Sequence, residues 1–564
     1  MKRMMFSLLL IVVMFAPMLS GTTYADNTVK ATVTESSTYF NGEEKEVYGF
    51  NIAGSNYYRL RDVAKNFSGT TSQFDASWNN KSNAIEITTG RPYTPEPEEN
   101  SVYYSPSRTY TAKISTSKIR VDGQPRLITA YNIDGNNYFQ LRDLADLVPF
   151  ELEYDIQSNK ISMSSQTPDN AFRVKTVTEA KSNAATSYFP RWKSTVKSYL
   201  VENKDGTFSV IDVDKEVVIE TYNNKFEWIA NKSIPNELPL FGGFFSGEQY
   251  NYIAFGQENR EEDNNKEVIR IVRYDKSFNR IDSVSIKGGE SYTVEPFDAG
   301  SGRMAENGNT LVFHTSRTRY TSDDGLNHQS QLTIIVNTSS MTVTNDLGKF
   351  QKNHVSHSFD QYVLFDGNNH VLVDHGDAYP RSIVMNKGDG TNYSEVDLFN
   401  IPGKIGANAT GVSIGGFEMS QNNYIVAMNT IDHSRVRDYT SYEMVGLEKD
   451  QRDIILRVLP KASSAVNEII LAKYVGSDFI ASIPTLVKIT DNKMIVLWQE
   501  FDKNNNPGDL KYVLIDGNGN ATGDMQTIKN FVLSECKPII SGDKMVWYTN
   551  SNGSRVFYSI PLVD

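Results

Sequence analysis

Two stretches near the start of the chain share one pattern of hydrophobic and polar positions. Residues 50–64 (FNIAGSNYYRLRDVA) align without a gap on residues 131–145 (YNIDGNNYFQLRDLA), at an offset of 81. In both, a strand, a turn and a second strand precede apolar residues at i, i+3, i+4 and i+7, the spacing of one helix face. These are Leu60, Val63, Ala64 and Phe67 in the first copy and Leu141, Leu144, Ala145 and Val148 in the second. The pattern predicts two small α+β modules, each an antiparallel sheet on one helix.

The repeat continues on both sides of these stretches. Asn41-Gly42 and Asp122-Gly123 lie at the same offset, and both dipeptides are typical of tight hairpin turns. After the helix, with slightly changed spacing, two apolar positions recur: Trp78 and Ile85, then Tyr154 and Ile161. We assign the first copy to residues 30–90 and the second to residues 111–165.

Residues 91–110 separate the two copies and contain the sequence RPYTPEPEEN. Proline and glutamate favour an extended, solvated chain over a packed one, so this stretch is predicted to be a linker. Each predicted helix also begins with an Arg-Asp pair, Arg61-Asp62 and Arg142-Asp143. An acidic residue there complements the helix dipole, which favours a structural ion pair or cap over a binding role.

From about residue 170 to residue 564 the pattern changes to short strands separated by turn residues. Similar strand clusters recur there at spacings of 50 to 70 residues, comparable with the roughly 40–50 residues of a propeller blade once insertions are added. They are 199–201, 252–255, 311–313, 362–365, 424–427, 495–498 and 545–548. We predict a mainly β region, a seven-bladed β-propeller closed by an early strand from about residues 173–190. A two-sheet sandwich and two smaller β-domains are the alternatives, and only 442–450 has helical character.

The first residues are typical of an export signal. Lys2 and Arg3 precede an apolar run, 4–15, and Thr23-Tyr24-Ala25 offers a small-residue cleavage site. We predict a signal peptide at residues 1–25 and a secreted, extracellular or cell-wall-associated protein. A retained anchor is the weaker alternative, because the run is shorter than the ~20 residues that span a bilayer. No later run is long enough for a transmembrane segment.

Composition narrows the possible partners. The formal net charge is −12 and no cluster of Lys and Arg occurs, so binding to nucleic acid is not expected. Cys536 is the only cysteine, which excludes a disulfide within the chain. A large exported chain without disulfides fits a bacterial exterior.

The motif Gly-x-Asn-Tyr-x-x-Leu-Arg-Asp-x-Ala occurs twice, at residues 54–64 and 135–145. Through this motif, residues 30–165 resemble the bacterial domain named after the N-terminal domain of copper amine oxidases, also called the stalk domain. That family typically occurs in tandem on exported proteins of Gram-positive bacteria. The resemblance implies a small antiparallel sheet wrapped on a helix, without a catalytic centre.

Amine oxidase chemistry is not expected, and neither is a cofactor. That chemistry needs a tyrosine inside Thr-x-x-Asn-Tyr-Asp/Glu and three histidines on copper. The nearest candidate, Asn392-Tyr393, has Asp389 in place of the threonine and is followed by Ser394.

Polar residues of chemical interest cluster late in the chain, where five of the seven histidines lie between His328 and His375. A metal site needs three or four such side chains to converge, and residues i and i+3 of a strand face opposite sides. We therefore assign no catalytic, cofactor or metal-binding residue, and regard residues 374–381 (DHGDAYPR) as the first place to seek a ligand. The residues left open as a site are His354, His357, His370, Asp374, His375 and Asp377.

Other motifs of site chemistry are weak. Residues 502–506 and 516–520 both read Asp-x-Asn-x-Asn, but lack the glycine that a calcium loop has at its sixth position, so they are interpreted as hairpin turns.

These observations favour a binding protein, in which the stalk modules space a propeller that presents a loop-rich face to a protein or a glycan. The alternative is an extracellular polysaccharide hydrolase or lyase with paired carboxylates in the central funnel, since 68 Asp and Glu leave many possible pairs.

Overall fold

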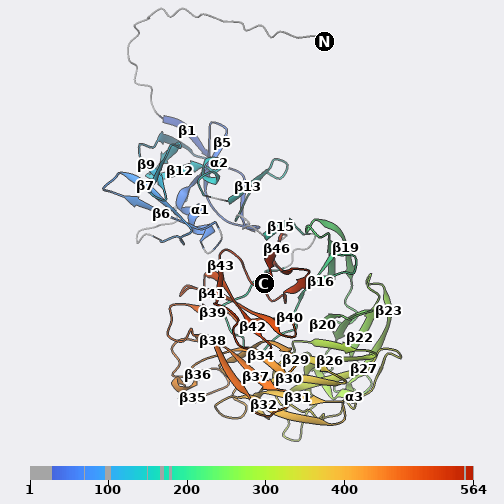
Figure 1. Ribbon diagram of the computed structural model, residues 1–564. Coiled ribbons are helices and arrows are strands. Elements are labelled where there is room, and N and C mark those ends of the chain that lie inside the picture. The colour runs from blue at the N-terminus through green and yellow to red at the C-terminus, as the bar shows by residue number, and fades with distance from the viewer. Residues whose placement is uncertain are drawn as a thin grey trace, which may run out of the picture.

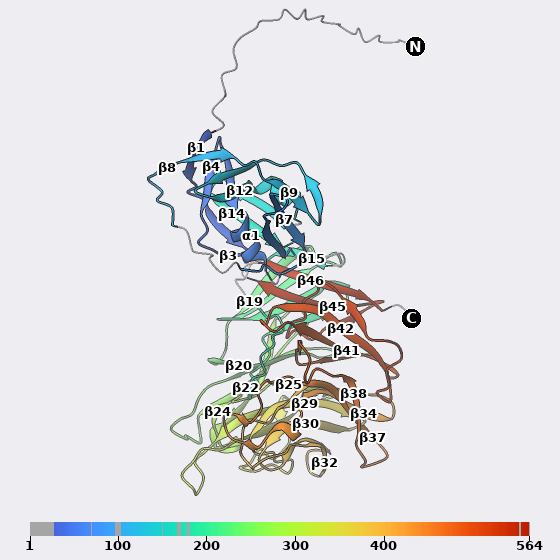
Figure 2. The same ribbon diagram turned by 90° about the vertical axis from the view of Figure 1, so that its left-hand side faces the viewer.

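The computed structural model describes residues 28–68, 70, 72–95, 103–148, 150–165, 171–176, 181–551 and 554–562. The predicted signal peptide, residues 1–25, lies outside these ranges. The chain is mainly β, as predicted, and forms two bodies (Figures 1 and 2): a small first unit beside β15 (Ala171–Lys175) and β46 (Ser554–Pro561), and a larger ring of sheets. In the described part of the chain, no helix is both long and apolar enough to cross a membrane.

The first unit is built from both copies of the repeat. Its central element is a closed barrel in the order β1-β4-β5-β12-β11-β8, and the pairs β1–β8 and β5–β12 each join one copy to the other. The barrel strands are β1 (Thr28–Val33), β4 (Gly49–Ile52), β5 (Ser55–Arg59), β8 (Thr109–Ile114), β11 (Ala130–Ile133) and β12 (Asn136–Gln140).

The two smaller sheets of this unit also mix the copies. One has the order β10-β9-β7-β6 and the other β13-β14-β2-β3, and the pairs β7–β9 and β14–β2 are parallel. Their strands are β2 (Ser37–Phe40), β3 (Glu43–Glu44), β6 (Phe74–Asn79), β7 (Ala84–Thr89), β9 (Lys118–Val121), β10 (Gln124–Arg126), β13 (Phe150–Asp155) and β14 (Lys160–Ser165). Both copies therefore belong to one folded unit with exchanged strands.

The local elements of the repeat agree with the sequence pattern. Helix α1 (Leu60–Phe67) buries all four predicted apolar residues, and α2 (Leu141–Ala145) packs Leu141 and Leu144 into the same core. Trp78 pairs with Ile85 across β6 and β7 as Tyr154 pairs with Ile161 across β13 and β14. Asn41 and Asp122 have positive φ angles, as do the glycines that follow them, which is the geometry of a tight hairpin turn.

Two details differ from the sequence interpretation. Asp62 forms its ion pair with Arg59, at 2.5 Å between Nη2 and Oδ1, rather than with the adjacent Arg61. The described ends of the linker are packed, because the rings of Tyr93 and Tyr104 are both buried in the cores of the first unit.

The described residues from 171 onward form seven main sheets of four or five strands and one two-stranded ribbon, β35 (Asp438–Tyr439) with β36 (Met444–Val445). We number the sheets 1 to 7 along the chain. Sheet 1 contains β16 (Ser198–Glu202), β17 (Phe208–Val213), β18 (Val217–Tyr222) and β19 (Trp228–Ile234); sheet 2 contains β20 (Leu240–Ser246), β21 (Asn251–Gly256), β22 (Glu267–Tyr274) and β23 (Arg280–Lys287). Sheet 3 follows the short helix α3 (Gly288–Ser291) and contains β24 (Thr293–Pro296), β25 (Arg303–Asn307), β26 (Thr310–Arg319), β27 (Gln329–Asn337) and β28 (Thr342–Val343).

In the remaining sheets, as in the first three, neighbouring strands are antiparallel. Sheet 4 contains β29 (Ser358–Asp366), β30 (Asn369–Asp377), β31 (Arg381–Gly388) and β32 (Tyr393–Asn400); sheet 5 contains β33 (Val412–Met419), β34 (Asn423–Thr430), β37 (Asp453–Pro460) and β38 (Asn467–Ala472). Sheet 6 contains β39 (Ile480–Ala481), β40 (Thr485–Thr490), β41 (Lys493–Phe501), β42 (Pro507–Asp516) and β43 (Gln526–Ile528). Sheet 7 contains β44 (Ile539–Ser541), β45 (Lys544–Ser551) and β46 (Ser554–Pro561), with β15 (Ala171–Lys175) at its edge.

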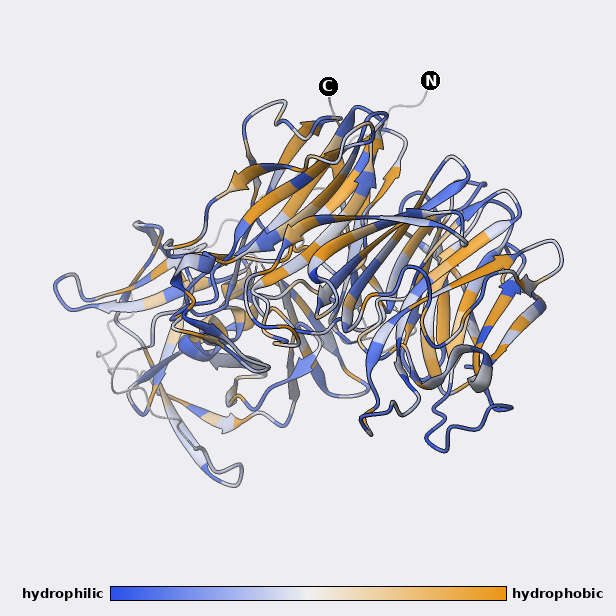
Figure 3. Cartoon of the chain, turned by 90° about the horizontal axis from the view of Figure 1, so that it is seen from below, coloured by the Kyte–Doolittle hydropathy of each residue, from blue (hydrophilic) through white to orange (hydrophobic). Residues whose placement is uncertain are grey.

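Hydrophobic clusters join each sheet to the next, and a last cluster joins sheet 7 back to sheet 1. In that last cluster the ring of Phe557 stacks on Phe226, with centroids 4.5 Å apart. The hydropathy colouring of Figure 3 follows this arrangement, with apolar residues concentrated on the strands and polar residues in the loops. Residues sharing a cluster across successive sheets include Ile219 and Ile253, Ile271 and Leu311, Ile335 and Val363, Val373 and Phe417, Leu456 and Val496, and Leu497 and Trp547.

Each predicted strand cluster falls in a different sheet, but the clusters are not equivalent. In the order in which the strands are given above, residues 199–201 and 362–365 belong to the first strand of their sheets, 252–255, 424–427 and 545–548 to the second, and 311–313 and 495–498 to the third. The predicted closing strand is β15, which pairs antiparallel with β46. Residues 442–450 are not helical, because they contain β36 and turns; a 3₁₀ turn, η1 (His433–Arg435), lies nearby.

The ring has two different faces. Short turns connect the first two strands of a sheet, as 203–207 connects β16 to β17 and 367–368 connects β29 to β30. We call the face of the ring that carries these turns the hairpin face. Longer segments such as 344–357, 401–411 and 431–452 connect strands at the opposite ends, and we call that side the loop face.

Candidate functional site

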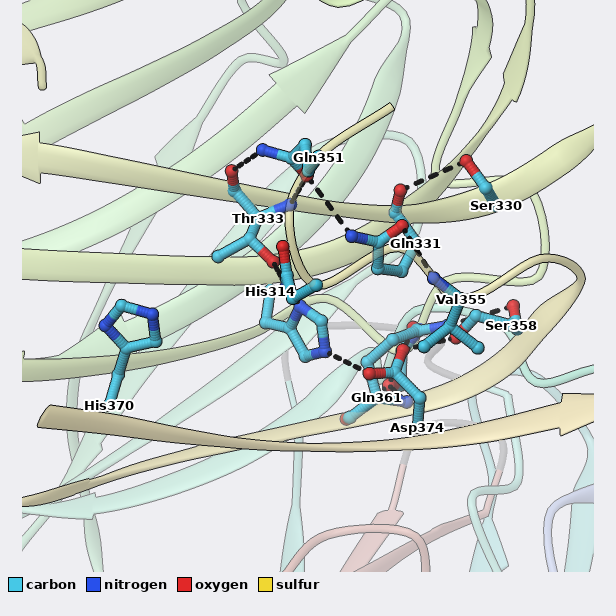
Figure 4. A network of polar contacts seen from close by, with 12 residues as sticks. His314, Ser330, Gln331, Thr333, Gln351, Val355, Ser358, Gln361, His370 and Asp374 are labelled. Atoms are coloured by element: carbon cyan, nitrogen blue, oxygen red, sulfur yellow. Dashed lines mark hydrogen bonds and ion pairs between the residues drawn. The ribbon is translucent and has the colours of Figure 1, made fainter. Parts of the chain in front are cut away.

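A buried polar network lies between sheets 3 and 4 (Figure 4). His314 of β26 contacts Asp374 of β30, with 3.0 Å between Nε2 and Oδ2, and its Nδ1 lies 3.0 Å from the hydroxyl of Thr333. Ser358 donates to the second oxygen of Asp374 at 2.6 Å. Asn353 donates to Thr333 at 2.8 Å and so ties the 344–357 segment to the same network.

The contacts run from a hydroxyl through a histidine to an aspartate, which resembles the arrangement of a nucleophilic triad. Here, however, Thr333, His314 and Asp374 are all fully buried, so a substrate has no access to the hydroxyl. The network satisfies polar groups that would otherwise be buried without partners between two sheets. We assign it a structural role.

The other residues left open by the sequence lie in separate surroundings. His357 contacts Asp377 at 3.0 Å, and Asp377 also accepts from Asn408 at 2.7 Å. His370 lies 2.6 Å from the hydroxyl of Tyr393, and burial lowers its pKa to about 4. In Figure 4 its ring has no contact with the network around His314.

The surroundings of His354 and His375 differ from those of His357 and His370. His354 lies edge-on to Phe350 on the loop face, with centroids 5.0 Å apart, and burial lowers its pKa to about 4. His375 is buried next to Phe359, and burial lowers its pKa to about 3. Across the described ranges, His, Cys, Asp and Glu nowhere gather in a group that could hold a metal ion.

The two Asp-x-Asn-x-Asn loops are hairpin turns. In the first, one carboxylate oxygen of Asp502 accepts from the backbone amides of Asn504 and Asn506. In the second, Asp516 makes the equivalent bonds with Asn518 and Asn520. The side chains that a calcium ion would need are therefore already used to close the turns.

Charged side chains meet at the centre of the ring. The guanidinium of Arg303 lies over the ring of Tyr362 at 4.2 Å, and Asp360 of β29 is buried close by. Burial raises the pKa of Asp360, while the positive charges of Lys193 and Arg303 oppose that shift. Burial lowers the pKa of Lys193, and the negative charge of Asp360 opposes that shift in turn.

A cleft of 1120 Å³ leads towards this centre from the hairpin face. It runs between sheets 1 and 2, and residues 537–540 of sheet 7 form part of its wall. Its inner wall contains Tyr199, Arg303 and Glu535, and burial raises the pKa of Glu535. Large apolar-walled clefts with a few convergent polar groups are the usual sites of small ligands.

Residues 181–197 cross the loop face between sheet 7 and sheet 1, and we call them the crossing segment. Lys193 donates its backbone N–H to Phe359 of sheet 4, and Thr195 bonds the carbonyl of Gly300 before β25. Further contacts join Ala184 to Ser534, Ser187 to Asn505, Phe189 to Arg452 and Arg191 to Ser441. The segment thus contacts sheet 4 and loops next to sheets 3, 5, 6 and 7, and lies across the loop-face end of the centre.

Exposed aromatic side chains gather on the loop face. The rings of Trp192 in the crossing segment and Tyr442 in the 431–452 segment both lie near the guanidinium of Arg191, with their centroids 4.7 Å and 5.4 Å from it. Tyr442 is 83% exposed. Aromatic rings that protein packing leaves uncovered are typical of interaction surfaces. Other exposed aromatic residues in loop-face segments are Tyr188, Tyr292, Phe350, Tyr379 and Phe479.

No protein-family model and no curated protein matches this sequence. Similar solved structures include BamB from Moraxella catarrhalis, at 7% identity over 69% of this chain and 98% of that one, with a TM-score of 0.33. The β-propeller domain of the Trilobed protease from Pyrococcus furiosus is similar at 11% identity over 66% and 97%, with a TM-score of 0.32. A protein of unknown function from Dyadobacter fermentans is similar at 10% identity over 62% and 100%, with a TM-score of 0.33.

Proposed function

We propose that the seven sheets are the blades of a β-propeller and that its loop face binds a protein or glycan ligand. The exposed aromatic rings of the loop face carry this proposal, with Trp192 and Tyr442 around Arg191 at its centre. Flat rings supply large contact areas at a small cost in side-chain entropy, which is why they dominate binding energy at interfaces.

We further propose that the first unit acts as a non-catalytic stalk and that the protein is exported to the cell surface or the medium. The tandem motif at residues 54–64 and 135–145 supports the stalk, and the charged-apolar-small order of residues 2–25 supports export. The net charge of −12 keeps such a protein soluble outside the cell.

The binding proposal is tested on the chain from residue 26 onward, applied to immobilised cell-wall and matrix polysaccharides and to surface proteins. We expect retention that falls by at least about tenfold in Tyr442→Ala and Trp192→Ala, because interface aromatics contribute about 2 kcal/mol or more each. Trp228→Ala is the matched control, because Trp228 is similarly exposed but lies on the edge strand β19. Equal retention of all three variants would contradict a loop-face site.

One observation favours the alternative function, hydrolysis of a polysaccharide. A carboxyl group with a raised pKa is what a general acid requires, and Glu535 in the cleft wall has one. Its central companion, Asp360, is almost completely buried under the crossing segment, which argues against a pair that a substrate can reach. Release of reducing ends by the wild type and not by Glu535→Gln would establish hydrolysis instead of binding alone.

A further inference from the structure

Arg319, the last residue of β26, has a buried guanidinium to which no carboxylate or carbonyl of the described residues is bonded. The residue is 3% exposed, its Nε and Nη1 atoms have no acceptor, and no ion pair involves it among the described residues. The ring of Phe350 covers its guanidinium at 4.5 Å. A buried charge without a counter-ion is costly, so natural proteins keep one where it has a use.

The surroundings of Arg319 add further positive charge. Arg317, two residues earlier and buried, donates to the carbonyls of Gln331 and Gly348, but its Nε has no acceptor either. Burial, and then the charge of Arg319, lower the pKa of Arg317 to about 9. The ammonium group of Lys349 also lies over the Phe350 ring, 5.9 Å from its centre.

Other buried arginines of the ring show what a satisfied guanidinium looks like here. Arg555 binds the carboxylates of Asp212 and Glu220. Arg381 donates to four backbone carbonyls, among them that of Ala407 at 2.6 Å. Arg319 has neither kind of acceptor, which leaves its donors available to a ligand.

We propose that Arg319 and Arg317 form a site for one oxyanion group, a phosphate, sulfate or carboxylate, with the Phe350 ring as its cover. Phe350 is 58% exposed, so its ring can turn away from Arg319 without leaving a cavity in the core. A guanidinium presents paired N–H donors that match the oxygens of such groups. The inference rests on the proposed function in one respect: it names the chemical group that the loop face recognises.

The first experiment measures binding of inorganic phosphate and inorganic sulfate to the chain from residue 26 onward by calorimetry. We expect Arg319→Gln to weaken binding by at least about tenfold, because bonds to charged groups are among the stronger ones. Without phosphate, Arg319→Gln is expected to have a higher Tm than the wild type, since an uncompensated buried charge is removed. Arg435→Gln is the control, because Arg435 is exposed on the loop face and paired with Asp432.

Unchanged phosphate affinity in Arg319→Gln, or a lower Tm without phosphate, would show that Arg319 serves packing and would overturn the proposal. Phe350→Ala gives an independent check, because it leaves both arginines in place and removes only an exposed ring. It is expected to bind phosphate at least as tightly as the wild type, and weaker binding by this variant also overturns the proposal.

The second experiment distinguishes a free ion from a group carried by a polymer, using polygalacturonate and its neutral methyl ester. Retention of the acidic polymer alone, lost in Arg319→Gln, supports a polymer-borne carboxylate. Phosphate binding without retention of either polymer supports a free oxyanion, and it leaves this site standing while binding of this glycan fails. Equal retention of both polymers by the wild type and Arg319→Gln keeps the proposed function and contradicts the oxyanion site.

Discussion

Arg555, on the last strand of sheet 7, forms an ion pair with Asp212, on the second strand of sheet 1. The same guanidinium binds Glu220, and Asp212 also accepts from the hydroxyl of Tyr548 at 2.8 Å. The first and last sheets of the ring therefore meet in one buried cluster of charged side chains. This buried ion pair adds to the hydrophobic cluster that also joins sheet 7 to sheet 1.

Arg555→Met is expected to destabilise the ring by about 3–5 kcal/mol, because it leaves the carboxylates of Asp212 and Glu220 buried without their cation. Urea unfolding followed by tryptophan fluorescence measures the change. Arg435→Met is the control, since its exposed pair with Asp432 contributes about 0–1 kcal/mol. A loss as small as that of the control would contradict this account of the junction.

The carboxylate of Asp366 is expected to make the folded state less stable in acid. Burial alone would raise the pKa of Asp366, but hydrogen bonds from Lys387, Lys461 and Tyr424 outweigh it, so the pKa lies below its ordinary value. A carboxyl group with a depressed pKa stabilises the fold above its unfolded pKa, about 3.9, and that contribution is lost as the pH falls below this value.

Asp366→Asn is therefore expected to be less stable than the wild type at pH 7 and to approach it as the pH falls below about 4. Thermal unfolding between pH 2 and pH 7 measures the difference. Asp438→Asn is the control, because the pair of Asp438 with Lys404 is largely exposed. Parallel curves for wild type and Asp366→Asn would show that the cluster contributes nothing.

The strand exchange in the first unit predicts that neither copy of the repeat folds alone. The ring of Phe67 from the first copy packs on Phe150 from the second, with centroids 5.1 Å apart. We expect residues 28–165 to unfold in one transition and residues 28–95 alone to show the circular dichroism of an unfolded chain. Phe67→Ala should destabilise the whole unit by about 3–5 kcal/mol. A cooperative transition in residues 28–95 would contradict the exchange.

The buried network around His314 predicts a defect in stability without a defect in binding. Asp374→Ala leaves His314 and Ser358 without their shared acceptor, at a cost of about 1–3 kcal/mol for each group. Urea unfolding measures this loss, and retention on the loop-face ligand should match the wild type after correction for the folded fraction. Asp324→Ala, which removes a largely exposed contact to His328, serves as the control.

Local periodicity explains what could be predicted of the fold. The apolar face of α1, the Asn41-Gly42 turn and the strand clusters of the ring all depend on neighbours within about ten residues. The exchange of strands between copies could not be predicted, because two nearly identical sequences offer the same local pattern to either partner. That choice is made by long-range packing such as the contact of Phe67 with Phe150.

For the candidate site, too, the sequence predicts local features but not the long-range contacts. The sequence drew attention to residues 374–381, but one of the two side chains that bind Asp374 is His314, 60 positions away on another sheet. Arg319 was missed although a signal existed. Arg317 and Arg319 continue the alternate positions of β26 after the buried Leu311 and Phe313, so a strand period of two places both arginines on an inward face.

The closing strand β15 also has a mechanical consequence. It follows the first unit in the sequence and precedes the crossing segment, and it is paired with β46 through five residues, from Ala171 with Tyr558 to Lys175 with Ser554. Tension applied to the first unit enters the ring through this strand. The backbone bonds that complete the circle are therefore the same ones that bear the load, and a strong pull would open the circle at its seam.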